Sequence, residues 1–204
     1  MADPTHTAID VALLLPDSLG DVLTTLNQIL QAPPDGFYFD FTHLPHLTLV
    51  QQFVRRHDLK AIADVVDDVI RKQAPLALTT THLSRAQVSS TIGVELTLEL
   101  VTLHRRLMER LEPFRDRIDS DDPHDAFATN HSGPRPADIE WVGMFRERSA
   151  LQRFNPHITI GVGALTRSVA PTPFVATRLA ICHLGRFCTC RRVLRAWTLT
   201  ASER

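Results

Sequence analysis

Several features are scarce or missing in this 204-residue sequence, and each absence narrows the class of protein. Nowhere do 18 apolar residues follow one another, so we expect no membrane-spanning helix. The first residues, Met1-Ala2-Asp3-Pro4, lack the basic and apolar stretches of a secretory signal, and we expect a cytoplasmic location. The net charge is only −1, so the sequence predicts no general attraction to long nucleic acids.

Cysteine is also rare, with three residues near the end of the chain: Cys182, Cys188 and Cys190. An odd number with this spacing fits neither a disulfide framework nor a zinc finger, so we expect reduced thiols. The ten histidines form no His-x-His pair, and no Cys-x-x-Cys pair occurs. The acidic stretch 119–125 is typical of a solvated loop. The sequence therefore predicts no metal site and no cofactor.

The length and the charge distribution suggest one domain with two unlike halves. A chain of 204 residues with 44% hydrophobic residues can form one domain, residues 1–204, of two lobes. Residues 1–134 carry 11 Lys and Arg against 19 Asp and Glu, a net charge of −8, whereas residues 135–204 carry 11 against 4, a net charge of +7. The basic second half suits an anionic ligand, although charge pairing between the halves fits the same counts.

A five-residue pattern occurs twice and is the most informative feature. Pro45-His46-Leu47-Thr48-Leu49 returns 111 positions later as Pro156-His157-Ile158-Thr159-Ile160. Each copy alternates like a short strand, in which side chains two apart share a face. The His and the Thr of each copy therefore project together, and the aliphatic residues project the other way. An imidazole and a hydroxyl, each present twice, are the parts of an acid–base site around a tetrahedral anion.

The hydrophobic pattern predicts the elements around these motifs. Residues 119–138 lack periodicity and are predicted to form a long, flexible loop. The segments His82-Leu83-Ser84-Arg85 and His183-Leu184-Gly185-Arg186 are similar and lie 101 positions apart, which indicates an internal duplication. Strands are predicted at 9–15, 76–83, 87–94, 139–145, 172–184 and 188–199, and helices at 19–30, 58–70 and 96–111.

The paired His-aliphatic-Thr-aliphatic motifs resemble those of the two-histidine (2H) phosphoesterase superfamily, and within it the RNA 2′,3′-cyclic phosphodiesterases, also called 2′-5′ RNA ligases. The resemblance implies an α+β fold of two pseudo-symmetric lobes, with mostly antiparallel sheets around a central cleft and helices on the outside. It implies a metal-independent enzyme of RNA processing that hydrolyses 2′,3′-cyclic phosphodiesters of RNA ends or small nucleotides to 2′-phosphates. It implies no cofactor and no stable protein partner.

The same resemblance assigns roles to the motif residues. His46 is expected to be the general acid and His157 the general base, while Thr48 and Thr159 bind the phosphate. Pseudo-symmetry leaves the two histidine roles interchangeable. Four further residues are candidates for substrate binding: Gln52 and Gly161, which alternation places on the site face, Arg153 as a phosphate contact and Phe41 as a base-stacking ring.

Other functions fit the same residues. The enzyme could act on 2′-5′ oligonucleotides or on ADP-ribose cyclic phosphate, or the protein could be a non-catalytic module that binds nucleotides or RNA ends. Both motifs could also be ordinary half-buried strands. Retention of both His and both Thr favours an enzyme, because binding alone would tolerate Asn or Gln in place of either His.

Overall fold

The two motif strands lie at the edges of two separate four-stranded sheets. The computed structural model describes residues 5–85, 89–118, 123–129, 133–167 and 169–200. The sheets have the strand orders β2-β1-β7-β8 and β5-β4-β3-β6, and the neighbouring strands are antiparallel. The strands are β1 (His6–Leu14), β2 (His46–Arg55), β3 (Leu76–Arg85), β4 (Ser89–Val94), β5 (His157–Val162), β6 (Pro173–Ala176), β7 (Arg178–Leu184) and β8 (Cys190–Thr198), and the helices are α1 (Asp17–Asn27), α2 (Leu59–Ile70), α3 (Leu98–Leu111) and α4 (Pro136–Ser149).

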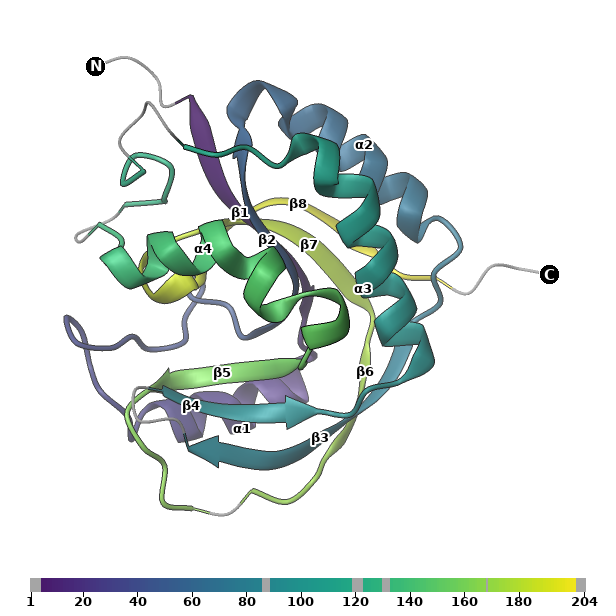
Figure 1. The fold of residues 1–204 in the computed structure, drawn as a ribbon. Helices are drawn as coiled ribbons and strands as arrows, with labels where there is room; N and C mark the ends of the chain where they lie inside the picture. Colours follow the sequence, from purple (N-terminus) through teal and green to yellow (C-terminus); the bar gives the residue numbers. More distant parts are fainter. Residues whose placement is uncertain (1–4, 86–88, 119–122, 130–132, 168, 201–204) are drawn as a thin grey trace.

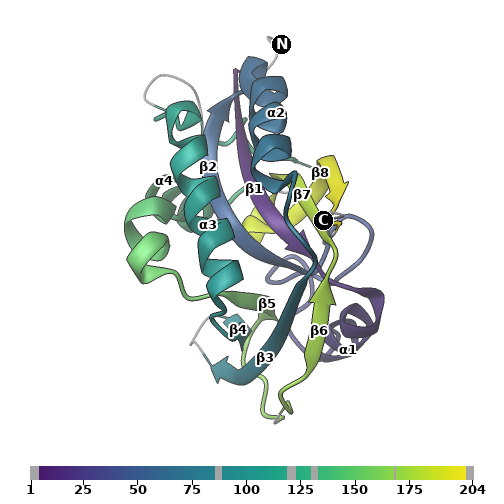
Figure 2. The ribbon, with the colours of Figure 1, turned by 90° about the vertical axis from the view of Figure 1, so that its right-hand side faces the viewer.

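The two sheets lie one above the other in Figure 1, with β1 and β2 in the upper sheet and β4 and β5 in the lower one. Helices α2 and α3 pack side by side (Figure 2), and α3 contacts β2. Helix α1 packs against β5, and α4 lies beside β2. The motif strands β2 and β5 contact each other across the gap between the sheets. The predicted α+β fold of two antiparallel lobes is confirmed.

Each sheet contains strands from both halves of the duplication. Strands β1 and β2 form one sheet, and β4 and β5 take the same positions in the other. The third strands are exchanged, because β7 pairs with β1 and β3 pairs with β4. The similar segments 82–85 and 183–186 lie at the ends of β3 and β7, so they mark equivalent strands. The predicted strand 172–184 is in fact two strands, β6 and β7, which belong to different sheets.

A β-bulge interrupts the first motif strand directly after the motif threonine. Thr48 of β2 pairs with Ala12 of β1. The next pair joins Val50 to Val11, so Leu49 is an extra residue without a partner position. An extra residue reverses the alternation of side chains beyond it, because strand residues alternate with a period of two.

The second motif strand has a bulge at the equivalent position. Thr159 of β5 pairs with Thr91 of β4, and Gly161 pairs with Ser90. Ile160 is therefore the extra residue, 111 positions after the extra residue of β2. The two halves of the duplication thus share a β-bulge directly after the motif threonine as well as the motif itself.

The buried side chain of Asn27 fixes the bulge in β5. Its amide nitrogen Nδ2 donates hydrogen bonds to the carbonyl oxygens of Ile160 (2.7 Å) and Phe37 (2.9 Å). Its Oδ1 accepts a hydrogen bond from the backbone N–H of Phe39 (2.8 Å). Asn27 therefore joins the bulge of one motif strand to the segment that leads into the other.

The buried ring of His104 makes the corresponding contacts at the bulge of β2. Nδ1 donates to the carbonyl oxygen of Leu49, the extra residue of β2, over 2.8 Å. Nε2 accepts a hydrogen bond from the backbone N–H of Leu151 over 2.8 Å, and the ring stacks on Phe154 with 3.8 Å between ring centroids. Leu151 and Phe154 lead into β5, so each bulge is tied to the approach of the other motif.

Helix α4 occupies the position where the sequence predicted a strand at 139–145, and this prediction was wrong. Pro136 is the first helical residue, and Asp138 Oδ2 accepts a hydrogen bond from the backbone N–H of Arg135 (2.8 Å). Both features are helix-start signals. The helix lacks a clear apolar stripe because its buried face includes the charged Asp138, while the apolar side chains of Trp141 and Met144 are exposed.

The segment 119–138 is only partly irregular, since its last three residues belong to α4. Residues 119–122 and 130–132 lie outside the described part of the chain. Between them, Ala126 and Phe127 are buried, and Phe127 packs against Phe53 with 5.8 Å between ring centroids. This portion of the predicted loop is therefore anchored to the core.

We predict that Asn27→Ala lowers the free energy of unfolding by about 3 kcal/mol, because it leaves two buried backbone carbonyls and one partly buried N–H without their hydrogen bonds. Denaturant unfolding measures the change. Gln28→Ala, at the next and exposed position, serves as the control and should change the value by less than about 0.5 kcal/mol. Equal effects of the two substitutions would contradict the proposed importance of this contact.

Candidate active site

The motif residues meet in one cleft of about 600 Å³. His46 and Thr48 enter it from β2, and His157 and Thr159 enter it from β5. They come together because both strands are edge strands that contact each other. Other lining residues include six aromatic side chains and three arginines: Phe37, Phe39, Trp141, Phe145, Phe154, Phe187, Arg135, Arg148 and Arg153.

The two motif histidines are oriented in the same way. Nδ1 of His46 donates a hydrogen bond to the carbonyl oxygen of Leu44 (2.7 Å), two residues earlier. Nδ1 of His157 donates to the carbonyl oxygen of Asn155 (2.9 Å), again two residues earlier. Because a carbonyl oxygen can only accept, Nδ1 carries hydrogen in both rings. In each ring Nε2 is therefore the nitrogen that can exchange a proton with a ligand.

A buried carboxylate distinguishes the first histidine from the second. Asp10 of β1 is completely buried, and its Oδ2 lies 3.5 Å from Nε2 of His46. The same oxygen accepts hydrogen bonds of 2.7 Å from Thr48 Oγ1 and Gln51 Nε2. Burial raises the pKa of Asp10, while His46 and the two hydrogen bonds act in the opposite direction. The first motif thus belongs to a polar network inside the sheet.

The second half of the chain has no such carboxylate at the equivalent position. Asp10 pairs with Gln51, and in the other sheet Ser89 pairs with Val162, which lies 111 positions after Gln51. Among the described residues, no carboxylate forms an ion pair with His157, and the hydroxyl of Thr159 has no hydrogen-bond partner. The site is therefore symmetric in its motifs and asymmetric in their surroundings.

Two predicted substrate-binding residues do not line the cleft, because the bulges reverse the alternation. Gln52 is buried, and its Nε2 donates to the carbonyl oxygen of Leu111 (3.2 Å); its neighbour Gln51 lines the cleft instead. Gly161 packs against the end of α1 and the residues after it, where an added Cβ would lie 2.9 Å from Asn27 Nδ2 and 2.8 Å from Leu30 Cδ1. Both predictions are corrected. The extra residues that cause the change carry no recognisable signal in a single sequence.

Of the other two residues that were predicted to bind the substrate, one lines the cleft. Arg153 does so, and its guanidinium donates a hydrogen bond to the carbonyl oxygen of Glu147. Phe41 does not, since it is 89% exposed and lies in a separate hollow beside Pro45. The aromatic residues of this segment that line the cleft are Phe37 and Phe39.

The arginines in the cleft all come from the basic second half of the chain. Arg135 pairs with Asp138 (2.6 Å) and stands over the ring of Phe187, 4.1 Å from its centroid. Arg148 pairs with an exposed glutamate at the surface. Arg146 is not among the residues that line the cleft, and its guanidinium donates a hydrogen bond to a backbone carbonyl of α3. The only carboxylate that lines the described cleft is Asp138, so the lining carries a positive charge.

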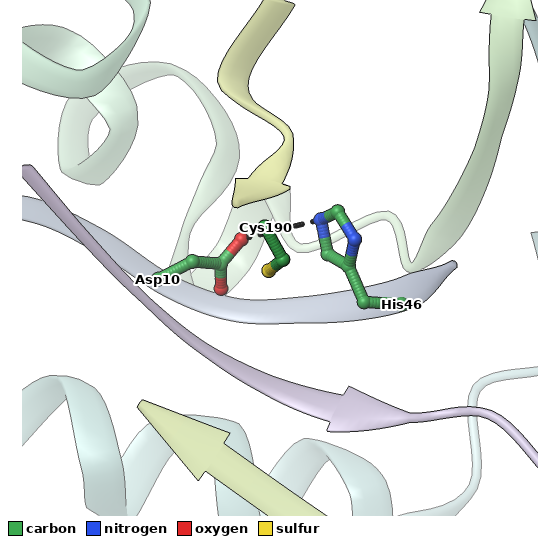
Figure 3. Close-up of side chains that lie close together, drawn as sticks. All are labelled: Asp10, His46 and Cys190. Carbon is green, nitrogen blue, oxygen red and sulfur yellow. Dashed lines mark ion pairs between the residues drawn. The ribbon is translucent and has the colours of Figure 1, made fainter. Parts of the chain in front are cut away.

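A cysteine thiol lies beside the Asp10–His46 pair. Figure 3 shows the side chains of Asp10, His46 and Cys190 turned toward one another from β1, β2 and β8. One possible ligand atom from each lies within 4.8 Å of the other two. Burial raises the pKa of the Cys190 thiol well above its ordinary value. The sequence missed this cluster because its members are far apart along the chain, although Asp10 is the one charge in the apolar run 8–15.

The two-lobed fold and the paired His-x-Thr strands define a two-histidine phosphoesterase. Residues 16–180 match the family model of the 2′-5′ RNA ligase superfamily, and the chain belongs to this superfamily. No curated protein sequence matches the chain. In the described part, no helix has the length and apolar character needed to cross a membrane.

Several solved structures share the fold at low sequence identity. A protein of Thermus thermophilus, TT0787, is 16% identical, with a TM-score of 0.59 over 97% of this chain and 100% of its own. Escherichia coli LigT in complex with phosphate is 16% identical, with a TM-score of 0.57 over 97% and 99%. LigT in complex with 3′-AMP is 17% identical, with a TM-score of 0.58 over 96% and 99%. These likenesses extend over nearly the whole chain.

We predict a loss of stability on acidification that depends on His104. Burial lowers the pKa of His104 below its ordinary value of 6.5, although the hydrogen bond to the carbonyl of Leu49 opposes the shift. Below pH 6.5 the unfolded chain binds a proton that the folded protein does not bind. The stability due to this residue is therefore complete above pH 6.5 and is lost as the pH falls toward the lowered value.

Denaturant unfolding of the natural sequence and of His104→Gln at about pH 5 and about pH 8 tests this prediction. The substitution should cost less free energy of unfolding at the lower pH. His57→Gln, at an exposed position, is the matched control and should cost the same at both. A cost of His104→Gln that did not change with pH would show that the buried ring does not resist protonation.

Proposed function

We propose that this protein hydrolyses 2′,3′-cyclic phosphodiesters, in small nucleotides or at RNA ends, to 2′-phosphates by a metal-independent reaction. The observation that carries the proposal is the equivalent orientation of His46 and His157 in one cleft. Each ring is held by a backbone carbonyl at Nδ1 and keeps Nε2 for proton transfer. Two such imidazoles on separate strands can serve the two sides of one phosphorus atom.

The reaction needs a base for the attacking water and an acid for the leaving oxygen. His157 takes a proton from water, whose oxygen forms the new bond to phosphorus. The bond from phosphorus to the 3′-oxygen breaks on the opposite side, and His46 gives its proton to that oxygen. The reaction leaves His46 neutral and His157 protonated, and proton exchange with solvent restores the starting state.

The surroundings of the histidines favour this assignment of roles. The acid must carry its proton before the reaction, and among the described residues Asp10 Oδ2, 3.5 Å from Nε2 of His46, is the carboxylate oxygen that pairs with a motif histidine. The base must be neutral, and His157 has no carboxylate partner among the described residues. The reverse assignment would place the carboxylate beside the ring that has to start without a charge.

The cleft has donors for the phosphate and flat surfaces for a base. Thr159 can donate its hydroxyl hydrogen to a non-bridging oxygen, and Thr48 can do so by turning from Asp10. Phe37, Phe39 and Trp141 line the cleft and can stack on a nucleobase. A volume of about 600 Å³ suits a mononucleotide. Crystal structures of LigT include complexes with 3′-AMP, ATP and NADP+.

A cytoplasmic location of this protein stays a prediction.

We predict that His46→Ala and His157→Ala each lower kcat by about 10²-fold or more, since each removes one of the two proton-transfer groups. The measurement is the hydrolysis of the four nucleoside 2′,3′-cyclic monophosphates with a chelator present, with product isomers resolved. His57→Ala, at an exposed position, should keep full activity. Full turnover by either folded motif variant would refute the mechanism, and loss of the natural activity in chelator would refute its metal independence.

We also predict that Asp10→Asn lowers kcat by about 10-fold, because His46 loses the carboxylate that lies 3.5 Å from its Nε2. The matched control is Ser89→Ala, which changes the equivalent position beside the second motif and should leave kcat nearly unchanged. Thermal unfolding of both variants separates an effect on folding from one on catalysis. A larger loss in Ser89→Ala would reverse the assignment of acid and base.

A further inference from the structure

The cluster of Asp10, His46 and Cys190 has the ligand types and the spacing of a transition-metal site. Its three possible ligand atoms lie within 4.8 Å of one another, and Asp10 Oδ2 and His46 Nε2 are 3.5 Å apart. Bonds of about 2.0–2.3 Å from Zn²⁺ to oxygen, nitrogen and sulfur place tetrahedral ligands about 3.5 Å apart. Side-chain shifts of about 1 Å would therefore bring all three atoms to bonding distance.

The outer contacts that a metal site requires are already in place. His46 Nδ1 donates to the carbonyl of Leu44, which fixes the ring and leaves Nε2 for a metal. Asp10 Oδ2 accepts hydrogen bonds from Thr48 and Gln51. Ligand histidines and carboxylates in metal sites usually make outer contacts of this kind. The side chains are thus held in position without a metal.

One atom of the cluster lacks a partner in the protein. Asp10 Oδ1 is buried and has no hydrogen-bond partner among the described residues. A buried carboxylate oxygen is normally paired, and one without a partner calls for an explanation such as an ion. The Cys190 thiol is also completely buried, is not among the residues that line the cleft, and takes no part in the proposed reaction. Asp10 Oδ1 is therefore open to a cation, whereas the Cys190 thiol, which is hydrogen-bonded to the side chain of Cys182, would exchange that contact for the metal.

We propose that Asp10, His46 and Cys190 bind a thiol-preferring divalent cation, Zn²⁺ in particular, and that this binding inhibits the enzyme. The combination of imidazole, thiolate and carboxylate selects Zn²⁺ or Co²⁺ over Mg²⁺ and Ca²⁺. The cation enters from the cleft, which His46 lines, and keeps its remaining position for water. Binding releases the protons of the thiol and of the Asp10–His46 pair to solvent.

Inhibition follows from the atom that the cation would use. Nε2 of His46 is the nitrogen that passes a proton to the leaving oxygen in the proposed reaction, and a metal on this atom prevents the transfer. This part of the inference rests on the proposed function. The binding itself does not, so the two can fail separately.

The test begins with the complete, metal-free chain titrated with Zn²⁺ by calorimetry in the absence of substrate. Cys190→Ser should weaken binding by at least about 10²-fold, because loss of outer contacts alone costs about 10- to 100-fold. Cys188→Ser, which changes a thiol two positions away, is the matched control and should bind as the natural chain does. Titration with Co²⁺ should produce a thiolate-to-metal absorption band in the natural chain and in Cys188→Ser, but not in Cys190→Ser.

Activity assays then test inhibition. Zn²⁺ should inhibit the natural chain, and Cys190→Ser should keep its turnover without metal and resist Zn²⁺. If Cys190→Ser does not fold, Cys190→Ala and Asp10→Asn replace it in the binding test. Absence of Zn²⁺ binding, or equally tight binding by Cys190→Ser, would overturn the proposal. Cys190-dependent binding in a protein that turns over no cyclic phosphate would support the site and refute the proposed function.

Discussion

The geometry of the cleft depends on two backbone carbonyls, those of the extra residues Leu49 and Ile160. A bulge leaves its carbonyl outside the regular ladder of the sheet, and a buried carbonyl without a partner is costly. His104 and Asn27 supply the missing donors, and each also bonds the chain segment that leads into the opposite motif. A displacement of either motif strand would therefore break hydrogen bonds on both sides of the cleft. The two motif strands are held relative to each other by two side chains that do not line the cleft.

The two motif strands and the side chains that hold their bulges are arranged symmetrically, whereas the proposed reaction is not symmetric. A duplicated fold places two equivalent imidazoles around one ligand, but an acid and a base must differ in charge at the start of a reaction. The difference arises one strand away, where β1 carries Asp10 and β4 carries Ser89 at the equivalent position. In the proposed reaction, one difference between equivalent strands would separate the two roles while the motifs themselves stay alike.

The sequence predicted the parts of this protein that follow a regular period. Strand alternation and helical spacing located both motif strands and the helices α1, α2 and α3, and the repeat indicated the duplication. The failures occur where a period is interrupted or absent. One extra residue per motif strand moved Gln52 and Gly161 off the cleft, and α4 combines a charged residue on its buried face with the exposed apolar side chains of Trp141 and Met144. The cluster of Asp10, His46 and Cys190 was not predicted because its residues lie on three strands that only the fold brings together.

The exchange of third strands has a consequence for how the chain can assemble. The sheet that contains the first motif needs β7, which ends at Leu184, and the sheet that contains the second motif needs β3, which begins at Leu76. Neither half of the chain can therefore build its own lobe. During synthesis β1, the partner of the first motif strand, keeps an unpaired edge until β7 has left the ribosome. Such dependence on distant partners favours slow, concerted folding over the independent folding of two repeats.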